Sequence, residues 1–205
     1  FLHNHDMNRF YSMVGEDFMK YKMGINLLFT QRGIPQLYYG TEVLMKNYKD
    51  PSDAEVRKDF PGGWPGDVEN KFLASGRNAQ ENEAFNYIKT LALFRKNSTA
   101  ITTGKLMQFV PKDGFYVYFR YDNKQTIMVI SNTGNNSYKP DWSFYKERLN
   151  GFSKMKNVIT YQKAIEPTAF VTKSKQRVKQ YDNNVIYLKN QEEFVIPGHN
   201  RVVFI

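Results

Sequence analysis

The residues best suited to chemistry lie within the first ten of the chain. The run Phe1-Leu2-His3-Asn4-His5-Asp6-Met7-Asn8-Arg9-Phe10 begins apolar and leads into Asn-His-Asp, with an arginine three positions after the aspartate. A histidine beside an aspartate can hydrogen-bond two neighbouring hydroxyl groups, one donating and the other accepting. At the end of a buried strand these side chains would line the rim of a pocket. Because a solvated turn has a similar composition, the interpretation depends on the elements around it.

The next elements read as a helix and a strand. Residues 16–32 show helical periodicity, with two neighbouring apolar stripes and one polar stripe of Lys22, Asn26 and Thr30. Glu16 and Asp17 would occupy the first turn, where carboxylates favour the helix dipole, so they are not interpreted as a catalytic pair. Residues 34–39 are apolar and aromatic and suit a buried strand. Strand, helix and strand in this order indicate a parallel α/β sheet or barrel.

A long polar stretch, residues 40–77, separates this unit from a second helix. It contains prolines at 51, 61 and 65, and a loop of this length in a compact domain is usually functional. The helix is predicted over residues 78–97, with Asn78 as N-cap and Glu81 three residues later.

Near residue 102 the sequence pattern changes from one typical of helices to one typical of β-strands. Residues 115–121 and 125–130 predict a hairpin, and further strands are predicted at 105–110, 157–161, 184–189, 193–196 and 201–205. Residues 141–150 favour one short helix. The second half is therefore predicted to be an antiparallel β-sandwich, with a domain boundary between residues 1–100 and 101–205.

Composition excludes several classes of protein. There are no cysteines, so no thiolate metal site is possible. The three histidines, His3, His5 and His199, do not make a zinc motif. The acidic residues lack the spacing of calcium ligands, and we predict no metal and no cofactor. No apolar run approaches the roughly 20 residues that span a bilayer. The net charge of +9 comes mostly from scattered lysines in residues 101–205, which favours a solvated surface over a nucleic-acid interface.

Three segments in fixed order carry a family resemblance. They are Phe1-Leu2-His3-Asn4-His5-Asp6, Gly33-Ile34-Pro35-Gln36-Leu37-Tyr38-Tyr39-Gly40-Thr41-Glu42 and Arg57-Lys58-Asp59-Phe60-Pro61-Gly62-Gly63-Trp64-Pro65-Gly66-Asp67. With them the whole chain resembles the α-amylase superfamily of glycoside hydrolases, and the third segment is similar to neopullulanase and cyclomaltodextrinase-like members. The resemblance implies an α/β plus all-β fold. Residues 1–100 would form the last strand–helix units of a (β/α)8 TIM barrel, and residues 101–205 the β-sandwich C-terminal domain.

The resemblance also implies roles for single residues. Asp6 would be the carboxylate that binds hydroxyls of the distorted sugar and stabilises the oxocarbenium-like transition state, and His5 would donate to the same sugar. Arg9 is assigned to substrate binding, with a structural bridge as the alternative. Trp64 is assigned to stacking on a sugar face, with a buried loop anchor as the alternative. His3 departs from the family pattern, and we expect it to support the site without contacting the sugar.

The resemblance to the family also indicates which catalytic groups this chain lacks. A retaining glycosidase needs a nucleophile and a general acid about 5–5.5 Å apart, and no segment here resembles the family motifs that supply them. Glu42, Asp59 and Asp67 are poor substitutes, because Glu42 matches a structural rim position and aspartates in Gly/Pro loops usually make turns. We therefore expect the chain to be the C-terminal piece of a longer enzyme, inactive alone.

The sequence thus predicts part of a retaining α-glucan hydrolase acting on starch-like polysaccharides. Its expected partners are an α-glucan and the missing N-terminal barrel portion, with no nucleic acid and no membrane span. A periplasmic or secreted location is expected from the resemblance alone. The alternative is a non-catalytic carbohydrate-binding or structural module, in which sugar affinity would reside in residues 101–205.

Overall fold

The chain forms two compact units. A computed structural model describes residues 1–152, 154–156, 158, 185–187 and 200–204. Residues 1–106 and 120–122 form the first unit, and residues 107–119 and 123–205 belong to the second. The domain boundary after residue 100 stays a prediction.

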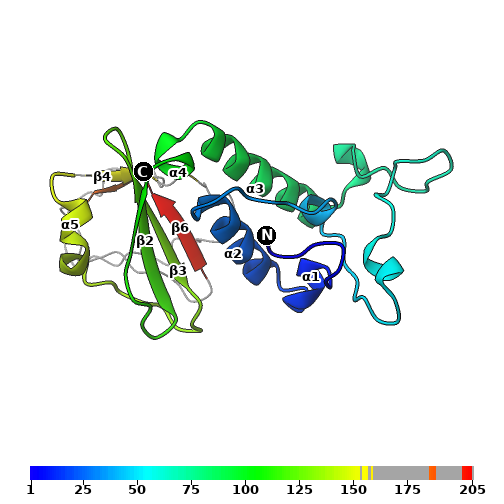
Figure 1. Cartoon of the computed structure of the whole chain (residues 1–205), viewed down its shortest axis with the longest axis horizontal. Helices are drawn as coiled ribbons and strands as arrows, with labels where there is room; N and C mark the ends of the chain where they lie inside the picture. Colours follow the sequence, from blue (N-terminus) through cyan, green and yellow to red (C-terminus); the bar gives the residue numbers. More distant parts are fainter. Residues whose placement is uncertain (153, 157, 159–184, 188–199, 205) are drawn as a thin grey trace, which may run out of the picture. The chain divides into compact units, whose positions relative to one another are not determined.

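Two long helices dominate the first unit. These are α2 (Phe18–Thr30) and α3 (Ala79–Lys96), which lie side by side in Figure 1 and are accompanied by the short α1 (Phe10–Met13) and α4 (Thr99–Thr102). Asp17 is the N-cap of α2, and its carboxylate accepts from the backbone N–H groups of Met19 (2.9 Å) and Lys20 (3.1 Å). Glu16 instead pairs with Lys46 at 2.6 Å. Both acidic residues are therefore structural, as predicted, but neither lies in the first turn of the helix, because α2 begins at Phe18 and not at residue 16.

The polar stripe of α2 is buried. Lys22, Asn26 and Thr30 all lie in the interior, whereas Leu27 on an apolar stripe is 40% exposed. Lys22 reaches Glu83 of α3 with its ammonium group at 3.0 Å, so its long stem is buried while its charge is paired. Thr30 donates back to the carbonyl of Asn26. Helical periodicity located the stripe correctly but did not show that α3 would cover it.

The helix α3 begins with a capping box, as predicted. The Asn78 side chain accepts from the N–H of Glu81 at 2.9 Å, and the Glu81 carboxylate accepts from the N–H of Asn78 at 2.8 Å. The predicted helix 78–97 is confirmed to within one residue at each end.

The predicted strands at the chain start and at residues 34–39 are wrong. Residues 1–104 are all described, and none of them belongs to a strand. A strand requires a hydrogen-bonded ladder with a neighbour. These two segments meet through side chains instead, since His3 contacts Tyr38 edge-on at 5.4 Å and hydrogen-bonds Thr41. The stretch that joins α2 to α3 contains three short 3-10 turns, η1 (Thr41–Val43), η2 (Asp53–Val56) and η3 (Ala74–Gly76).

An antiparallel sheet follows the helices. Its order is β1 (Lys105–Gln108), β2 (Phe115–Tyr121), β3 (Thr126–Asn132) and β6 (Asn200–Phe204), with Ile130 opposite Val202. A second sheet pairs β4 (Lys154–Lys156) with β5 (Val185–Tyr187). These strands confirm the predicted hairpin and the predicted strands near 105, 185 and the chain end. The predicted strands at 157–161 and 193–196 lie outside the described residues, apart from Val158, which is not in a strand.

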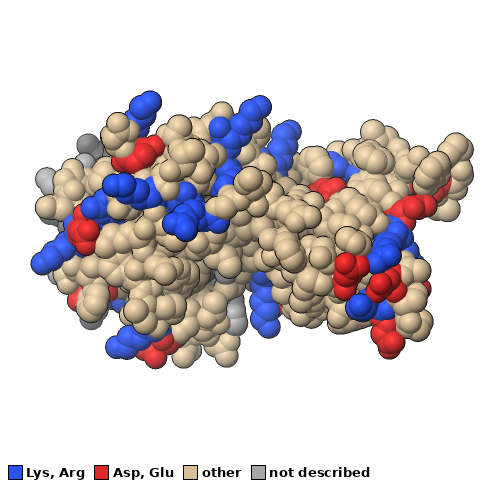
Figure 2. All heavy atoms as spheres, viewed as in Figure 1, with Lys and Arg blue, Asp and Glu red and all other residues tan. Residues whose placement is uncertain are grey.

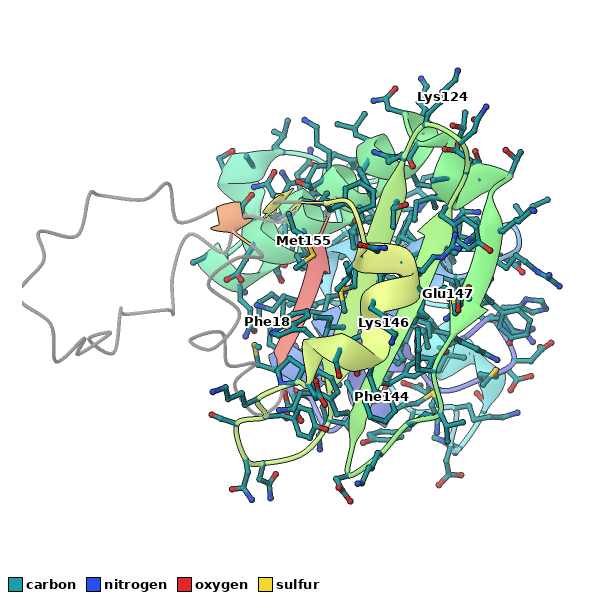
Figure 3. The ribbon with its side chains drawn as sticks, turned by 90° about the vertical axis from the view of Figure 1, so that its left-hand side faces the viewer. Phe18, Lys124, Phe144, Lys146, Glu147 and Met155 are labelled. Atoms are coloured by element: carbon teal, nitrogen blue, oxygen red, sulfur yellow. The ribbon has the colours of Figure 1, made fainter. Side chains whose placement is uncertain are left out.

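One short helical turn covers a face of the sheet in the second unit. It consists of η4 (Trp142–Tyr145) and α5 (Lys146–Leu149), close to the helix predicted at 141–150. Tyr145 packs edge-on against Phe109 at 4.9 Å and lies 6.4 Å from Phe119 of β2. Figure 3 shows Phe144, Lys146 and Glu147 along this turn.

Candidate active site

His5 and Asp6 lie side by side on an exposed turn. The Nε2 atom of His5 is 3.3 Å from Oδ2 of Asp6, and the two side chains are 60% and 55% exposed. Asn4 stabilises the turn with two hydrogen bonds. Its side-chain oxygen accepts from the backbone N–H of Asp6 at 2.9 Å, and its carbonyl oxygen accepts from the backbone N–H of Met7. The predicted pair is therefore accessible, and both side chains have polar atoms available to a ligand.

Arg57 binds this turn from the other side, and sequence reasoning did not single it out. Its Nη2 donates to Oδ1 of Asp6 at 2.7 Å and its Nε donates to the carbonyl of His5 at 3.0 Å. Fifty-one positions separate Arg57 from Asp6. The only signal in the sequence was an aspartate four residues before the arginine, the spacing of a local ion pair.

That aspartate, Asp53, completes a network of charges. Its carboxylate binds Arg57 at 3.0 Å and Lys49 at 3.1 Å, and Lys49 also donates to the carbonyl of Asp6 at 3.3 Å. The Lys49 ammonium, helped by Arg57, holds the pKa of Asp53 below its usual range. Figure 2 shows acidic and basic side chains interleaved over the loop drawn in cyan in Figure 1.

Arg9, three residues after Asp6, is only 1% exposed. Its Nη1 donates to the carbonyl of Tyr39 at 2.5 Å. Its guanidinium carbon lies 4.4 Å and 4.7 Å from the ring centres of Tyr38 and Tyr39. Arg9 thus forms a structural bridge, which was the alternative role considered from the sequence. Its contact with substrate stays a prediction.

His3 supports the site from the interior. Its Nε2 is 2.8 Å from Oγ1 of Thr41, and this hydroxyl in turn donates to the carbonyl of Tyr38. Because the hydroxyl has only one hydrogen, Nε2 must carry the proton of the imidazole. Burial, reinforced by the positive charge of Arg9, lowers the pKa of His3 to about 4, so the ring is neutral at pH 7.

Glu42, considered in the sequence as a substitute acid, is partly buried at the start of η1. Its Oε2 is buried and has no hydrogen-bond partner among the described residues. Burial raises the pKa of this carboxyl, although Arg9 partly opposes the shift.

The loop after η2 presents Trp64 to solvent. The side chain is 64% exposed, so the alternative of a buried anchor is wrong. Asp67 makes the turn, as predicted, because its Oδ2 accepts from the N–H groups of Gly62 (2.7 Å) and Trp64 (3.1 Å). Lys71 fastens the loop to α3, since its ammonium lies 2.7 Å from the same Glu81 oxygen that accepts from the backbone of Asn78.

Neither a metal cluster nor a membrane span is found among the described residues. In that part of the chain no three His, Asp or Glu side chains are grouped as metal ligands. The helices described there are too short or too polar to cross a bilayer.

Comparisons with known proteins agree with this picture. The family model of the α-amylase catalytic domain matches residues 1–61, and that of the cyclo-malto-dextrinase C-terminal domain matches residues 106–178. A cyclomaltodextrin glucanotransferase of Geobacillus stearothermophilus is 31% identical over 137 residues, which are 67% of this chain and 17% of that protein. An α-amylase of Niallia circulans is 30% identical over 139 residues, 67% of this chain and 23% of its own length.

Solved structures show the same fold. The crystal structure of the α-amylase from Geobacillus thermoleovorans, complexed with acarbose, superposes with a TM-score of 0.61 at 17% identity, over 99% of this chain and 37% of that one. The chain therefore has the fold of the C-terminal part of these enzymes, a portion of the barrel followed by the β domain. It spans about a fifth of the length of the two curated relatives. On the matches to these two family models, the curated relatives and the shared fold, the chain belongs to the α-amylase superfamily of glycoside hydrolases.

Proposed function

We propose that this chain is the C-terminal part of a retaining α-glucan hydrolase of the α-amylase or neopullulanase type, acting on α-glucosidic bonds of starch-like polysaccharides. The observation that carries the proposal is the exposed His5–Asp6 pair, which lies in the segment matched by the catalytic-domain model. The nature of the relatives, a glucanotransferase and an amylase, supports an α-glucan as substrate.

In this proposal Asp6 neither attacks nor protonates the substrate. Arg57 holds its Oδ1, and its Oδ2 lies beside His5, so the pair can receive two neighbouring sugar hydroxyls. Hydrogen bonds from hydroxyls to a carboxylate strengthen as the ring gains oxocarbenium character. Because they strengthen in the transition state, they lower the barrier and do not merely tighten substrate binding.

The nucleophile and the general acid come, in this proposal, from a barrel portion on the N-terminal side. No segment of the sequence resembles the motifs that carry them. The chain by itself is therefore expected to bind sugar weakly and to turn over neither maltooligosaccharides nor pullulan.

The test is an Asp6→Asn variant of the enzyme that contains this chain and the rest of the barrel. We expect kcat on maltooligosaccharides to fall at least about a hundredfold, with a small change in KM and an unchanged melting temperature. Asp59→Asn, at an exposed position of the nearby loop, is the matched control and should keep wild-type kcat. A near-wild-type kcat for Asp6→Asn would remove the role assigned to Asp6.

A further inference from the structure

We propose that Arg57 is a positioning residue that fixes the orientation of the Asp6 carboxylate, and that Asp53 holds Arg57 in place for this purpose. The inference rests on the proposed function, because it concerns the geometry of the carboxylate to which that function assigns transition-state stabilisation.

The first argument is the two-point contact. One guanidinium group binds Oδ1 of Asp6 at 2.7 Å and the backbone carbonyl of His5 at 3.0 Å. A contact to the carboxylate alone would leave the turn free to rotate, and a contact to the carbonyl alone would leave the side chain free. Together they fix both the backbone and the side chain of Asp6. The rigid, planar fork of arginine suits this geometry, whereas the ammonium group of lysine is a single point.

The second argument is the rigidity of the segment that carries Arg57. Val56 is fully buried, and its carbonyl accepts from the hydroxyl of Tyr38 at 3.3 Å. On the other side, the hydroxyl of Tyr39 donates to the carbonyl of Lys58 at 2.8 Å. The residues before and after Arg57 are thus both tied to the 38–39 segment, so the base of the arginine side chain is held.

The third argument is the bracing of the guanidinium group. Asp53 binds the same Nη2 that reaches Asp6, at 3.0 Å, and Lys49 binds both Asp53 and the Asp6 carbonyl. Arg57 therefore lies between two carboxylates, of which one faces the site and the other belongs to its own turn. This arrangement restricts the side chain to the rotamer that reaches Asp6.

The solvent exposure of Arg57 and Asp6 allows a positioning role of Arg57 to be distinguished from a contribution to folding stability. The Arg57 side chain is 45% exposed and the Asp6 side chain 55%. Ion pairs at such exposed positions contribute little to folding stability. A purely structural role would therefore have small effects everywhere, whereas a positioning role predicts a clear loss of kcat at unchanged stability.

The experiment compares variants of the enzyme that contains this chain, assayed on maltooligosaccharides. Arg57→Ala is expected to lower kcat by about tenfold to a hundredfold, since small displacements of a reacting geometry cost rates of this size. KM should change less than about threefold, and the melting temperature should stay unchanged. Guanidinium ions added to Arg57→Ala should restore part of kcat. Arg57→Lys should lie between Arg57→Ala and the wild type.

Two further variants complete the design. Asp53→Asn should lower kcat in the same direction as Arg57→Ala but to a smaller extent. Lys58→Ala is the matched control, because Lys58 neighbours Arg57 in sequence but pairs with Glu55, and it should keep wild-type kcat.

The outcomes distinguish the two proposals. If Asp6→Asn loses activity while Arg57→Ala stays within twofold of wild-type kcat, the positioning role is wrong and the proposed function stands. A rise in KM at unchanged kcat in Arg57→Ala would also overturn the positioning role, because Arg57 would then bind substrate directly. If Asp6→Asn keeps activity, the proposed function itself fails.

Discussion

Arg95, in the last turn of α3, donates from Nη1 to the carbonyl oxygen of Phe29, near the end of α2, at 2.9 Å. The same guanidinium group also reaches the carbonyls of Gln31, at 3.2 Å, and Gly33. The last carbonyl groups of a helix lack partners within the helix, and a positive charge there complements the helix dipole. Arg95 therefore caps α2 from a neighbouring helix, and its burial lowers its pKa.

Replacing Arg95 by alanine should destabilise the first unit. The variant leaves three carbonyl groups without this donor and should lower the free energy of unfolding by about 2 kcal/mol or more. Lys96→Ala is the matched control, because Lys96 is the exposed next residue, and it should change stability by less than about 0.5 kcal/mol. Chemical denaturation followed by far-ultraviolet circular dichroism measures both. Equal stabilities of the two variants would show that the capping contact contributes nothing.

The buried His3 should make stability depend on pH. Its pKa in the folded chain is about 4, against 6.5 for an unperturbed histidine. The unfolded chain therefore takes up a proton that the folded chain excludes, so this contribution is complete above pH 6.5 and is lost as the pH falls towards 4. The loss is on the order of 3 kcal/mol.

The measurement is the urea midpoint between pH 7 and pH 4 for wild type and His3→Asn. The variant should show a flatter dependence over this window, although it is less stable at pH 7. If His3→Asn and the wild type have parallel profiles, His3 is not the group responsible.

Glu42→Gln should stabilise the chain at neutral pH. Burial raises the pKa of this carboxyl, so its ionised form is disfavoured in the folded state and stability falls as the pH rises through the pKa of the carboxyl. A neutral glutamine removes that cost, and its advantage should vanish at acidic pH, where Glu42 is protonated. Thermal melts at pH 4 and pH 7 test this.

Glu55→Gln is the control of opposite sign. Its hydrogen bond with Lys58 lowers the pKa of Glu55, so the ionised form is the favoured one. This variant should gain nothing at pH 7. An advantage at pH 7 shared by both variants would point to a general effect of negative charge and away from burial of Glu42.

Trp64→Ala should weaken glucan binding without affecting stability. The ring is exposed, so its removal creates no cavity and should change the free energy of unfolding by less than about 0.5 kcal/mol. Loss of stacking on a sugar face should weaken binding of maltoheptaose by about threefold to tenfold. Phe144→Ala, at an exposed aromatic of the second unit, is the control and should bind like wild type. Unchanged affinity in Trp64→Ala would remove Trp64 from the binding residues.

Local signals predicted the fold where the contacts are local. The capping box of Asn78 and Glu81 spans three residues, and the turn made by Asp67 spans five, so both could be read directly. The hairpin of β2 and β3 is equally local. The strands predicted at the chain start and at residues 34–39 failed because a strand depends on a ladder partner, which one segment cannot specify.

The candidate site divides in the same way. His5 and Asp6 were found because the two residues are adjacent and belong to a known motif. Arg57 was missed because its contact with Asp6 joins distant parts of the chain. The interior position of Lys22 was missed because Glu83, which pairs with it, belongs to another helix.

The contact between Lys71 and Glu81 determines how the loop that carries Trp64 can be exchanged between enzymes. One oxygen of Glu81 serves both the start of α3 and the loop that displays Trp64. A graft that ends at residue 77 would separate Lys71 from its acceptor and leave the first turn of the helix with an altered cap. The natural unit for transplanting a new specificity loop therefore runs through Glu81, so that the loop arrives together with its own attachment point.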